Sequence, residues 1–451
     1  TVFGSRNSNK AFDPSGTGLT AIPEFERWVF SPDLFYYPNE KTQIQLGISF
    51  TGEERRGGDI EFLDGNKPSG YVEFNNSDRF STRFSWERRS GRSHLTLKNS
   101  LGHFHRMVEI PGYIFKGNQF STFTEFTYSY NGEKTEWIGG LNIISDRFKE
   151  EIATQPDKRD YDDLAGGVFI QQNLSISEHI KIESGLRGDI VKDYGFVVLP
   201  RIAVLFRFSS QLSSRIGAGM GYKAPNIFTE ESERLHYRNV LPVDKDQNKF
   251  EKSYGFNADL NYRASFSDTR WTFSINHLFF FTRINDPLLL RPDNNDFRFV
   301  NVKGHFDSRG METNIRLGYG DLKLFMGYTF TRADLHEGNK KTENFLTPRH
   351  RLNTVLLYEQ EDKWKLGLEA YYFSPQKLSD GTTGRSYWIT GFMAERLFRK
   401  FSLYINFENF LDTRQTKFGN IYTGSMSDPV FRDIYAPLDG FVINGGIKMK
   451  F

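Results

Sequence analysis

His103 and His105 are spaced so that they could bind a metal ion or a polar ligand together. They stand two residues apart, and on an extended backbone the side chains of residues i and i+2 point to the same side. Neutral imidazole is a common metal ligand, so such a pair could chelate an ion. The alternative is an exposed segment that carries histidine without any ligand. Both residues are therefore candidate ligand-binding residues, and the sequence leaves the identity of a metal open.

His236, Tyr237 and Arg238 form a second candidate group within the long polar segment 222–250. Binding residues concentrate on loops that a rigid scaffold holds in place, and this segment combines an imidazole, a phenol and a guanidinium group. We expect the three residues to form part of an external ligand mouth. A loop histidine that is simply solvated is the plainer alternative.

The sequence argues against an enzyme. No nucleophile elbow, P-loop, HExxH or GxGxxG motif stands where its chemistry needs it, and no Ser/His/Asp set marks a lipase or protease. The chain has no cysteine, so it has neither a disulfide framework nor a thiolate metal site. Segment 13–18 resembles a reduced calcium loop, but its single carboxylate falls short of the several oxygens that Ca²⁺ requires, so we expect a turn. We expect no resident cofactor.

Composition limits the class of protein. The 451 residues include 44 Phe and 21 Tyr, yet the mean hydropathy is −0.55 and 25% of the residues are charged. A strand that faces lipid on one side and a polar lumen on the other explains that combination. No apolar run of roughly 18 or more residues exists, which argues against membrane helices. The net charge of +2 gives no general attraction for nucleic acid.

Alternation between apolar and polar residues recurs along the chain. In the last segment Ile443, Ile447 and Met449 share one parity, whereas Asn444 and Lys448 share the other. The same pattern appears in segments 44–50, 168–176, 322–330 and 364–372. These strands run for about ten residues or more, longer than the five or six of a typical soluble β-sandwich. The pattern predicts an all-β protein, a transmembrane antiparallel β-barrel that fills residues 1–451.

The connections between these strands are of two kinds. Short polar turns near residues 38–41, 90–93, 131–134, 178–179, 209–213, 320–321 and 361–363 alternate with long segments such as 147–164, 222–250, 285–306 and 411–437. Outer-membrane barrels have short periplasmic turns and long external loops. We count about 20 strands, and a barrel of that size is either a channel or a plugged transporter. Basic residues such as Arg207, Arg215, Lys365 and Arg396 are expected to face the lumen and to attract anionic chelates.

Four short motifs carry a resemblance to a known family. Tyr-Lys-Ala-Pro at 222–225 is followed by Lys-Phe-Glu-Lys-Ser-Tyr-Gly at 249–255, by Thr-Pro-Arg-His-Arg-Leu at 347–352 and by Phe-Glu-Asn-Phe-Leu-Asp at 407–412. In order and spacing they resemble the barrel motifs of TonB-dependent outer-membrane receptors. Phe451, at the end of an amphipathic strand, looks like the recognition signal for barrel assembly.

The resemblance implies a barrel of about 22 strands closed by an N-terminal plug domain. Here no plug-like segment and no TonB box are found, and we expect the chain to begin inside the third strand of such a barrel. We therefore expect a plug and two further strands to precede Thr1 or to arrive as a separate chain. The expected location is the outer membrane of a Gram-negative bacterium, and the implied partners are TonB, outer-membrane lipids and a surface lipoprotein.

Uptake of a scarce, large nutrient chelate follows from the resemblance, with a ferric siderophore as the first candidate. Cobalamin and haem are the alternatives within the family, and His236 lies where haem receptors place an axial histidine. Outside the family, a passive diffusion porin and an envelope scaffold for a lipoprotein are the alternatives. The sequence does not discriminate among the ligands.

Overall fold

The computed structural model describes residues 1–152, 158–266 and 270–449, which form two compact units. The first unit consists of Thr1–Ala203, Gly219–Tyr254 and Ile284–Lys303. The second consists of Val204–Ala218, Gly255–Arg283 and Gly304–Phe451. Phe451, the expected assembly signal, lies outside the described residues.

Strands make up most of both units. Those within the first unit are β1 (Val2–Asn9), β2 (Glu24–Asn39), β3 (Thr42–Gly58), β4 (Val72–Ser90), β5 (Ser93–Ile110), β6 (Tyr113–Asn131), β7 (Thr135–Glu150), β8 (Tyr161–Ser175), β9 (Ile180–Val191), β14 (Leu288–Asp293) and β15 (Asp296–Asn301). Four strands have residues in both units, namely β10 (Gly195–Arg207), β11 (Leu212–Lys223), β12 (Glu251–Ser265) and β13 (Trp271–Asn285). Those within the second unit are β16 (Gly304–Tyr319), β17 (Leu322–Glu337), β18 (Lys340–Glu343), β19 (His350–Gln360), β20 (Trp364–Phe373), β21 (Tyr387–Leu397), β22 (Phe401–Glu408), β23 (Tyr422–Ser425), β24 (Asp428–Phe431) and β25 (Val442–Met449).

The helices are short and lie in the connections. They are α1 (Ile60–Leu63), α2 (Glu230–Arg234) and the single 3₁₀ turn η1 (Gln415–Lys417). Among the described residues, no helix has the length and apolar character needed to cross a membrane.

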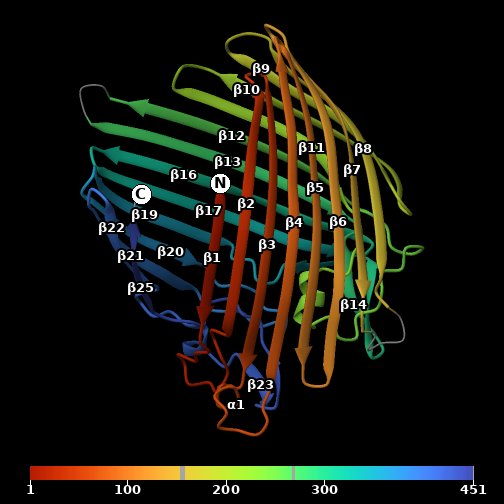
Figure 1. The fold of residues 1–451 in the computed structure, drawn as a ribbon, viewed down its shortest axis with the longest axis vertical. Coiled ribbons are helices and arrows are strands. Elements are labelled where there is room, and N and C mark those ends of the chain that lie inside the picture. Colours follow the sequence, from red (N-terminus) through yellow and green to blue (C-terminus); the bar gives the residue numbers. More distant parts are fainter. Residues whose placement is uncertain (153–157, 267–269, 450–451) are drawn as a thin grey trace. The chain divides into compact units, whose positions relative to one another are not determined.

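Twenty-one of the strands belong to one large antiparallel sheet in the described part of the chain, as the sequence predicts. Without the four-residue β18, twenty strands remain, which agrees with the expected number. In the first unit each of β1 to β8 pairs with the next strand along the chain (Figure 1). In the second unit the order is β16, β17, β19, β20, β21, β22 and β25.

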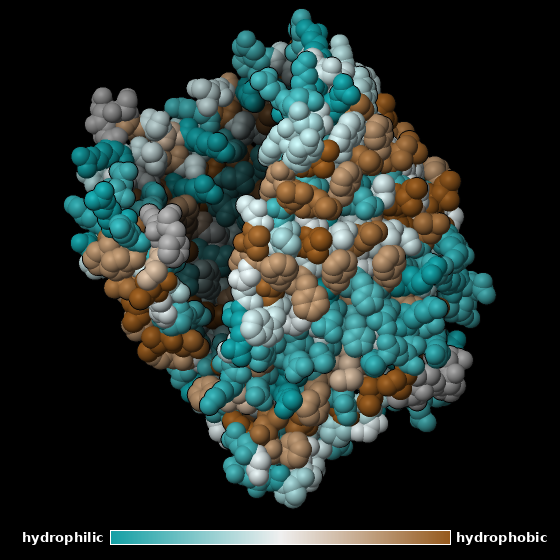
Figure 2. All heavy atoms as spheres, in the orientation of Figure 1, coloured by the Kyte–Doolittle hydropathy of each residue, from teal (hydrophilic) through white to brown (hydrophobic). Residues whose placement is uncertain are grey.

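The strands of the first unit are longer than a bilayer needs. β3 to β6 have 17 to 19 residues, whereas about 9–11 tilted residues cross the hydrocarbon. Their exposed apolar side chains, such as Leu46, Phe80, Leu101 and Leu141, lie on one face. Figure 2 shows hydrophobic residues gathered in a band over the strands of the first unit, with hydrophilic surface between the band and the end that carries the long loops. The strands therefore have room for a lipid-facing band and a polar extension.

Short turns and long loops alternate along most of the chain, but not throughout as predicted, because β5–β6 and β9–β10 are joined by the short connections 111–112 and 192–194. Two of the long loops contain hairpins. The pairs Ser90↔Ser93 and Tyr319↔Leu322 close turns of two residues. The expected loop 285–306 contains the hairpin β14–β15, and β16 already begins at Gly304. The expected loop 411–437 contains η1 and the hairpin β23–β24. The Asp13 carboxylate accepts backbone N–H bonds within its own loop, which confirms a turn there.

The predicted parity of the last strand is confirmed. Ile443 and Ile447 lie opposite Phe407 and Leu403 on the exposed apolar face, whereas Asn444 donates to Glu408 on the other face. The expectation for Arg396 is wrong.

Arg396 pairs directly with Trp364, and its guanidinium carbon lies 4.7 Å from the Trp364 ring centroid. It therefore shares the apolar face. Lys365, one residue along from Trp364, lies on the polar face, where it forms an ion pair with Glu359.

A candidate ligand cavity in the first unit

A cavity of about 960 Å³ opens on the polar face of β4 to β8, toward their long-loop end. Ladder registers carry Arg79, Phe104, Gln119, Phe148 and Tyr161 across the five strands in one row. The next row contains Ser81, Gly102, Ser121 and Asp146. Opposite residues of neighbouring strands point to the same face, so both rows line the cavity together.

Small residues in the strands leave the room that the cavity occupies. A Cβ at Gly117 would lie 2.5 Å from the Phe148 ring, and a Cβ at Gly102 would lie 2.7 Å from the Ser121 hydroxyl. Glycine at 117 therefore lets the Phe148 ring pack flat against the strand. Because these neighbouring residues are small, the aromatic side chains of Phe104, Phe148 and Tyr161 have room to line the cavity together.

The loop between β11 and β12 supplies the other wall. Asn226, Phe228, Thr229 and the helix α2 contribute to the lining. Thr229 caps the helix, because its side chain accepts a hydrogen bond from the Ser232 N–H. The cap determines where the chain turns and so directs Glu233 toward the strands.

A buried core holds this loop against the strands. Tyr237 is 1% exposed, and its ring stacks on Phe115 with centroids 4.3 Å apart. Members of the core come from β5, β6, β7, β15 and the loop itself: Val108, Tyr113, Phe115, Phe148, Ile227, Tyr237, Val240 and Phe299. The loop wall is thus part of a packed core.

An ion pair lies within the same core. The side chains of Arg159 and Glu150 are 1% and 2% exposed, and the guanidinium Nη2 donates to Glu150 Oε1. Arg159 also donates to the Tyr237 carbonyl and to the Tyr113 hydroxyl, the latter at 3.1 Å. Burial lowers the pKa of Arg159, but the hydrogen bond to Glu150 outweighs that effect, and the pKa lies above its ordinary value. The guanidinium group of Arg159 is therefore charged, and its hydrogen bonds to Glu150 tie the loop to β7.

Most charges in the cavity wall neutralise one another. Arg106 Nη2 lies 2.5 Å from Glu233 Oε1, and the Tyr237 hydroxyl donates to Glu233 Oε2 at 2.7 Å. Burial raises the pKa of Glu233, but these two hydrogen bonds outweigh it and hold the pKa below its usual value. Burial and the hydrogen bond to Glu233 raise the pKa of Tyr237. Glu233 is therefore an anion and Tyr237 a neutral phenol at neutral pH.

The Asp146 carboxylate also has hydrogen-bond donors within the cavity wall. It accepts hydrogen bonds from Gln119 Nε2 at 2.9 Å and from the Tyr161 hydroxyl at 3.0 Å. Arg79 differs, because within the described ranges it has no ion pair with a carboxylate. Its guanidinium carbon lies 4.8 Å from the Phe104 ring centroid. The cavity thus presents one uncompensated cation beside an aromatic surface.

The structure places the predicted group of three at this wall in three different environments. Tyr237 lines the cavity from within the core. The Nε2 atom of His236 lies 2.9 Å from Glu73 Oε2, and Arg238 is exposed. His236 and Tyr237 have positive φ angles of 52° and 62°, which bend the chain directly after α2. Tyr237 is therefore the member of the group that contacts the cavity.

His103 and His105 lie within β5, in a strand rather than in a loop. Strand alternation places their side chains on the face opposite to that of Gly102, Phe104 and Arg106. His103 contributes to the cavity rim, and His105 Nδ1 lies 4.0 Å from Asp78 Oδ2. A role for either residue in ligand binding stays a prediction.

Sequence reasoning missed the residues that dominate the cavity, Arg79, Phe104 and Phe148. For Arg79 the signal is the parity of its strand, since Arg79 and Ser81 flank the exposed Phe80, whereas Phe104 between His103 and His105 carries no such signal. Parity identifies the lumen face, but only the register shows which residues of five strands stand in one row.

Comparison with known proteins agrees with this fold. The sequence model described as "TonB dependent receptor-like, beta-barrel" matches residues 3–410. The copper transporter OprC superimposes with a TM-score of 0.77 at 12% sequence identity, and the match covers 100% of this chain and 75% of the OprC chain. The siderophore receptor PirA from Acinetobacter baumannii superimposes with a TM-score of 0.74 at 13% identity, with 100% and 75% covered.

The curated relatives include a vitamin B12 transporter, BtuB, from Vibrio cholerae. It is 22% identical over 188 residues, which are 42% of this chain and 28% of the relative. The matched region is thus well under two thirds of that protein's length. The solved structures establish the fold, and the family model extends over most of the chain. The chain belongs to the TonB-dependent receptors, a family of receptors and transporters in the bacterial outer membrane.

Proposed function

We propose that this chain forms the barrel of a receptor that imports a ferric siderophore, with energy supplied through TonB. The observation that carries the proposal is the cavity of the first unit, where the unpaired cation of Arg79 lies beside Phe104. Ferric siderophores combine an anionic metal-binding centre with flat, often aromatic, chelating groups. A guanidinium group bound in a partly apolar site suits such a ligand, because it can donate two parallel hydrogen bonds to an anion.

Geometry adds a second argument. The cavity is about 960 Å³ in volume, within the range of about 300–1,000 Å³ typical of small-molecule sites. Its carboxylates, Asp146, Glu230 and Glu233, are already bonded to other side chains, so they do not compete for Arg79. An incoming anion therefore meets a cation that has no other strong partner within the described chain.

Cobalamin is the second candidate, because the matched curated relatives are named as vitamin B12 transporters. Haem is a weaker alternative. A haem iron would need a ring nitrogen of His236, and the Nε2 atom of that ring already contacts Glu73 at 2.9 Å.

The test is uptake in a strain that lacks its own receptors and expresses the full-length gene. Uptake of ⁵⁵Fe bound to catecholate, hydroxamate and carboxylate siderophores is compared with uptake of ⁵⁷Co-cobalamin. We expect saturable uptake of at least one ferric siderophore. Uptake of cobalamin alone, or leakage of small solutes without saturable uptake, would overturn the proposal.

A matched pair of variants tests the cavity itself. Arg79→Ala should weaken binding of the imported siderophore about 10-fold or more, because a hydrogen bond to a charged group contributes roughly 1.5–3 kcal/mol. Arg88→Ala is the control, since Arg88 lies on the same strand near the short turn, nine residues away. Equal affinities for the two variants, at equal amounts of folded protein, would remove Arg79 from the site.

A further inference from the structure

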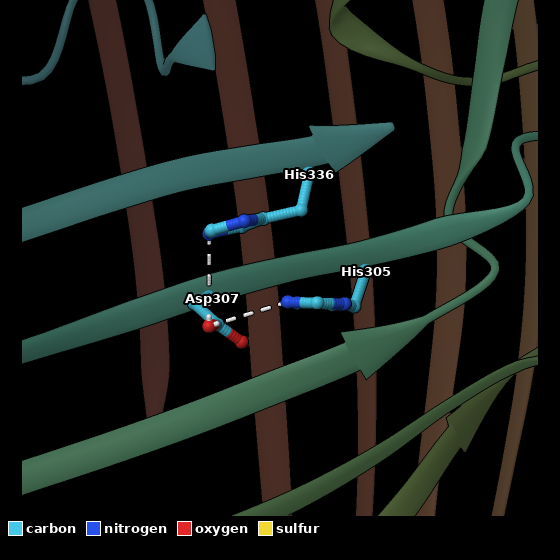
Figure 3. Close-up of side chains that lie close together, drawn as sticks. All are labelled: His305, Asp307 and His336. Atoms are coloured by element: carbon cyan, nitrogen blue, oxygen red, sulfur yellow. Dashed lines mark ion pairs between the residues drawn. The ribbon is translucent and has the colours of Figure 1, made fainter. Parts of the chain in front are cut away.

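Three potential metal ligands meet at the long-loop end of two strands in the second unit. His305 and Asp307 lie near the start of β16, and His336 lies near the end of β17 (Figure 3). Their ligand atoms all lie within 4.8 Å of one another. In the described part of the chain this is the one group of three or more His, Cys, Asp or Glu side chains with that property.

The ladder register brings the three together. His305 stands directly opposite His336, and the rings stack at 17° with centroids 4.5 Å apart. Asp307 is two residues beyond His305, so its side chain points to the same face. Gly304 permits the close approach, because a Cβ there would collide with the His336 carbonyl oxygen.

Both rings present the same nitrogen to one carboxylate oxygen. His305 Nε2 lies 3.5 Å from Asp307 Oδ2, and His336 Nε2 lies 3.9 Å from it (Figure 3). Two ligands of a tetrahedral ion with bonds of about 2.0–2.1 Å are about 3.4 Å apart. Ligand atoms that lie up to 4.8 Å apart would therefore have to approach by up to about 1.4 Å, through rotation of the two stacked imidazoles, to bind one ion.

The Asp307 carboxylate also accepts two hydrogen bonds from Arg283. Arg283 donates from Nε to Asp307 Oδ1 at 2.6 Å and from Nη2 to Oδ2 at 2.8 Å. Each carboxylate oxygen has two lone pairs, so Oδ2 can accept from Arg283 and still bind an ion. Metal-binding carboxylates are commonly oriented by such outer hydrogen bonds. The neighbouring Asp334 forms ion pairs with Lys341 at 3.0 Å and with Arg332 at 2.9 Å.

The cluster lies on the same face as the apolar residues of β17. Leu324, Met326 and Tyr328 alternate along that face, and Asp334 and His336 continue it beyond the apolar stretch. The two imidazoles are each 29% exposed, whereas the Asp307 side chain is 12% exposed. An ion can therefore enter from outside the sheet, and a water molecule can complete its coordination.

We propose that His305, Asp307 and His336 bind a divalent transition-metal ion such as Zn²⁺ or Cu²⁺ on the outward face of the β16–β17 pair. Two imidazole nitrogens and one carboxylate suit these ions, whereas Ca²⁺ and Mg²⁺ require several oxygens. The ion would link the outer ends of two strands. The site is separate from the proposed siderophore cavity, which is built from residues of the first unit.

The experiment is metal titration of the full-length receptor, purified in detergent through a tag without histidine and stripped with EDTA. Zn²⁺ binding is measured by competition with a chromophoric chelator, and Cu²⁺ binding by electron paramagnetic resonance. We expect one tight equivalent of Zn²⁺, nitrogen hyperfine structure in the Cu²⁺ spectrum, and no displacement by millimolar Ca²⁺. A wild-type chain that binds no Zn²⁺ or Cu²⁺ tightly would overturn the proposal, whatever the variants do.

Variants then assign the ion to the cluster. His305→Ala and His336→Ala should each weaken binding at least 10-fold, and the double variant should lose the site. His350→Ala is the matched control, because His350 opens the neighbouring β19 and its Nδ1 contacts the Tyr328 hydroxyl at 2.8 Å. Folding is checked by heat-modifiable migration in electrophoresis. Tight binding that survives in a folded double variant would overturn the assignment.

Discussion

Replacing Arg159 by methionine should release the loop between β11 and β12 from the strands without unfolding the sheet. Methionine keeps much of the side-chain length and removes the charge. Glu150 would then be left buried, at 2% exposure, without its partner. The carbonyl of Tyr237 and the hydroxyl of Tyr113 would each lose a donor.

The expected magnitude follows from the burial. Removing one partner of a buried ion pair costs about 3–5 kcal/mol. If the backbone amides of residues 232–240 exchange hydrogen only when the loop opens, they should exchange about 100 to 5,000 times faster in the variant than in the wild type. Arg159→Met combined with Glu150→Leu should cost less than the sum of the single changes, because no unpaired buried charge remains.

Native-state hydrogen exchange resolved by peptide is the assay, since it reports local opening in a protein too large for simple two-state unfolding. Arg238→Met is the control, because Arg238 is exposed in the same loop. Acceleration of less than about 10-fold in Arg159→Met would refute the claim that the buried pair holds the loop. Strict additivity in the double variant would refute the coupling.

Three further outcomes are expected. Ile447→Arg should destabilise the folded barrel by roughly 2–4 kcal/mol or block its assembly, because Ile447 lies on the lipid-facing side. Asn444→Arg is the control on the other face, where the new side chain can pair with Glu408, and it should cost much less. Similar midpoints of urea unfolding for the two variants would contradict the face assignment. Glu233 has a pKa below the ordinary value of 4.5, so its contribution to the stability of the loop between β11 and β12 should be fully present above pH 4.5. This contribution should be lost as the pH falls through the lowered pKa. Exchange corrected for intrinsic rates should show this loss in the loop, and Glu233→Gln should abolish it. Arg106→Gln should weaken the loop contact at neutral pH, and no change in exchange would contradict the ion pair.

The fold could be predicted because alternation is a local property. The segments 322–330 and 364–372 of the second unit carry their own apolar and polar parity, and the predicted turn at 320–321 joins β16 to β17. Two of the motifs that carry the family resemblance, at 249–255 and 347–352, lie where strands begin, since β12 begins at Glu251 and β19 at His350. Arg396 was misplaced because its position next to Glu395 does not reveal the parity of a strand whose residues are of mixed character.

The sites could not be predicted in the same way. Segment 285–306 is predicted to be a long loop, yet it contains the β14–β15 hairpin and the first residues of β16. His305 was therefore not placed on a strand. His103 and His105 have the same two-residue spacing as His305 and Asp307, but the structure brings a third ligand atom only to the latter pair.

The sequence by itself determined the class of architecture, the approximate number of strands and, in the segments that alternate cleanly, the face that turns to lipid, because side-chain alternation and turn residues act over a few positions. Only the tertiary structure decided which residues meet. Arg79 and Tyr161 stand in one row although 82 positions separate them, and His305 faces His336 across a ladder. The register of each pair of neighbouring strands depends on cooperative packing along both strands. A shift of two residues would preserve the alternation in each strand but would separate the residues that form the cavity and the histidine cluster.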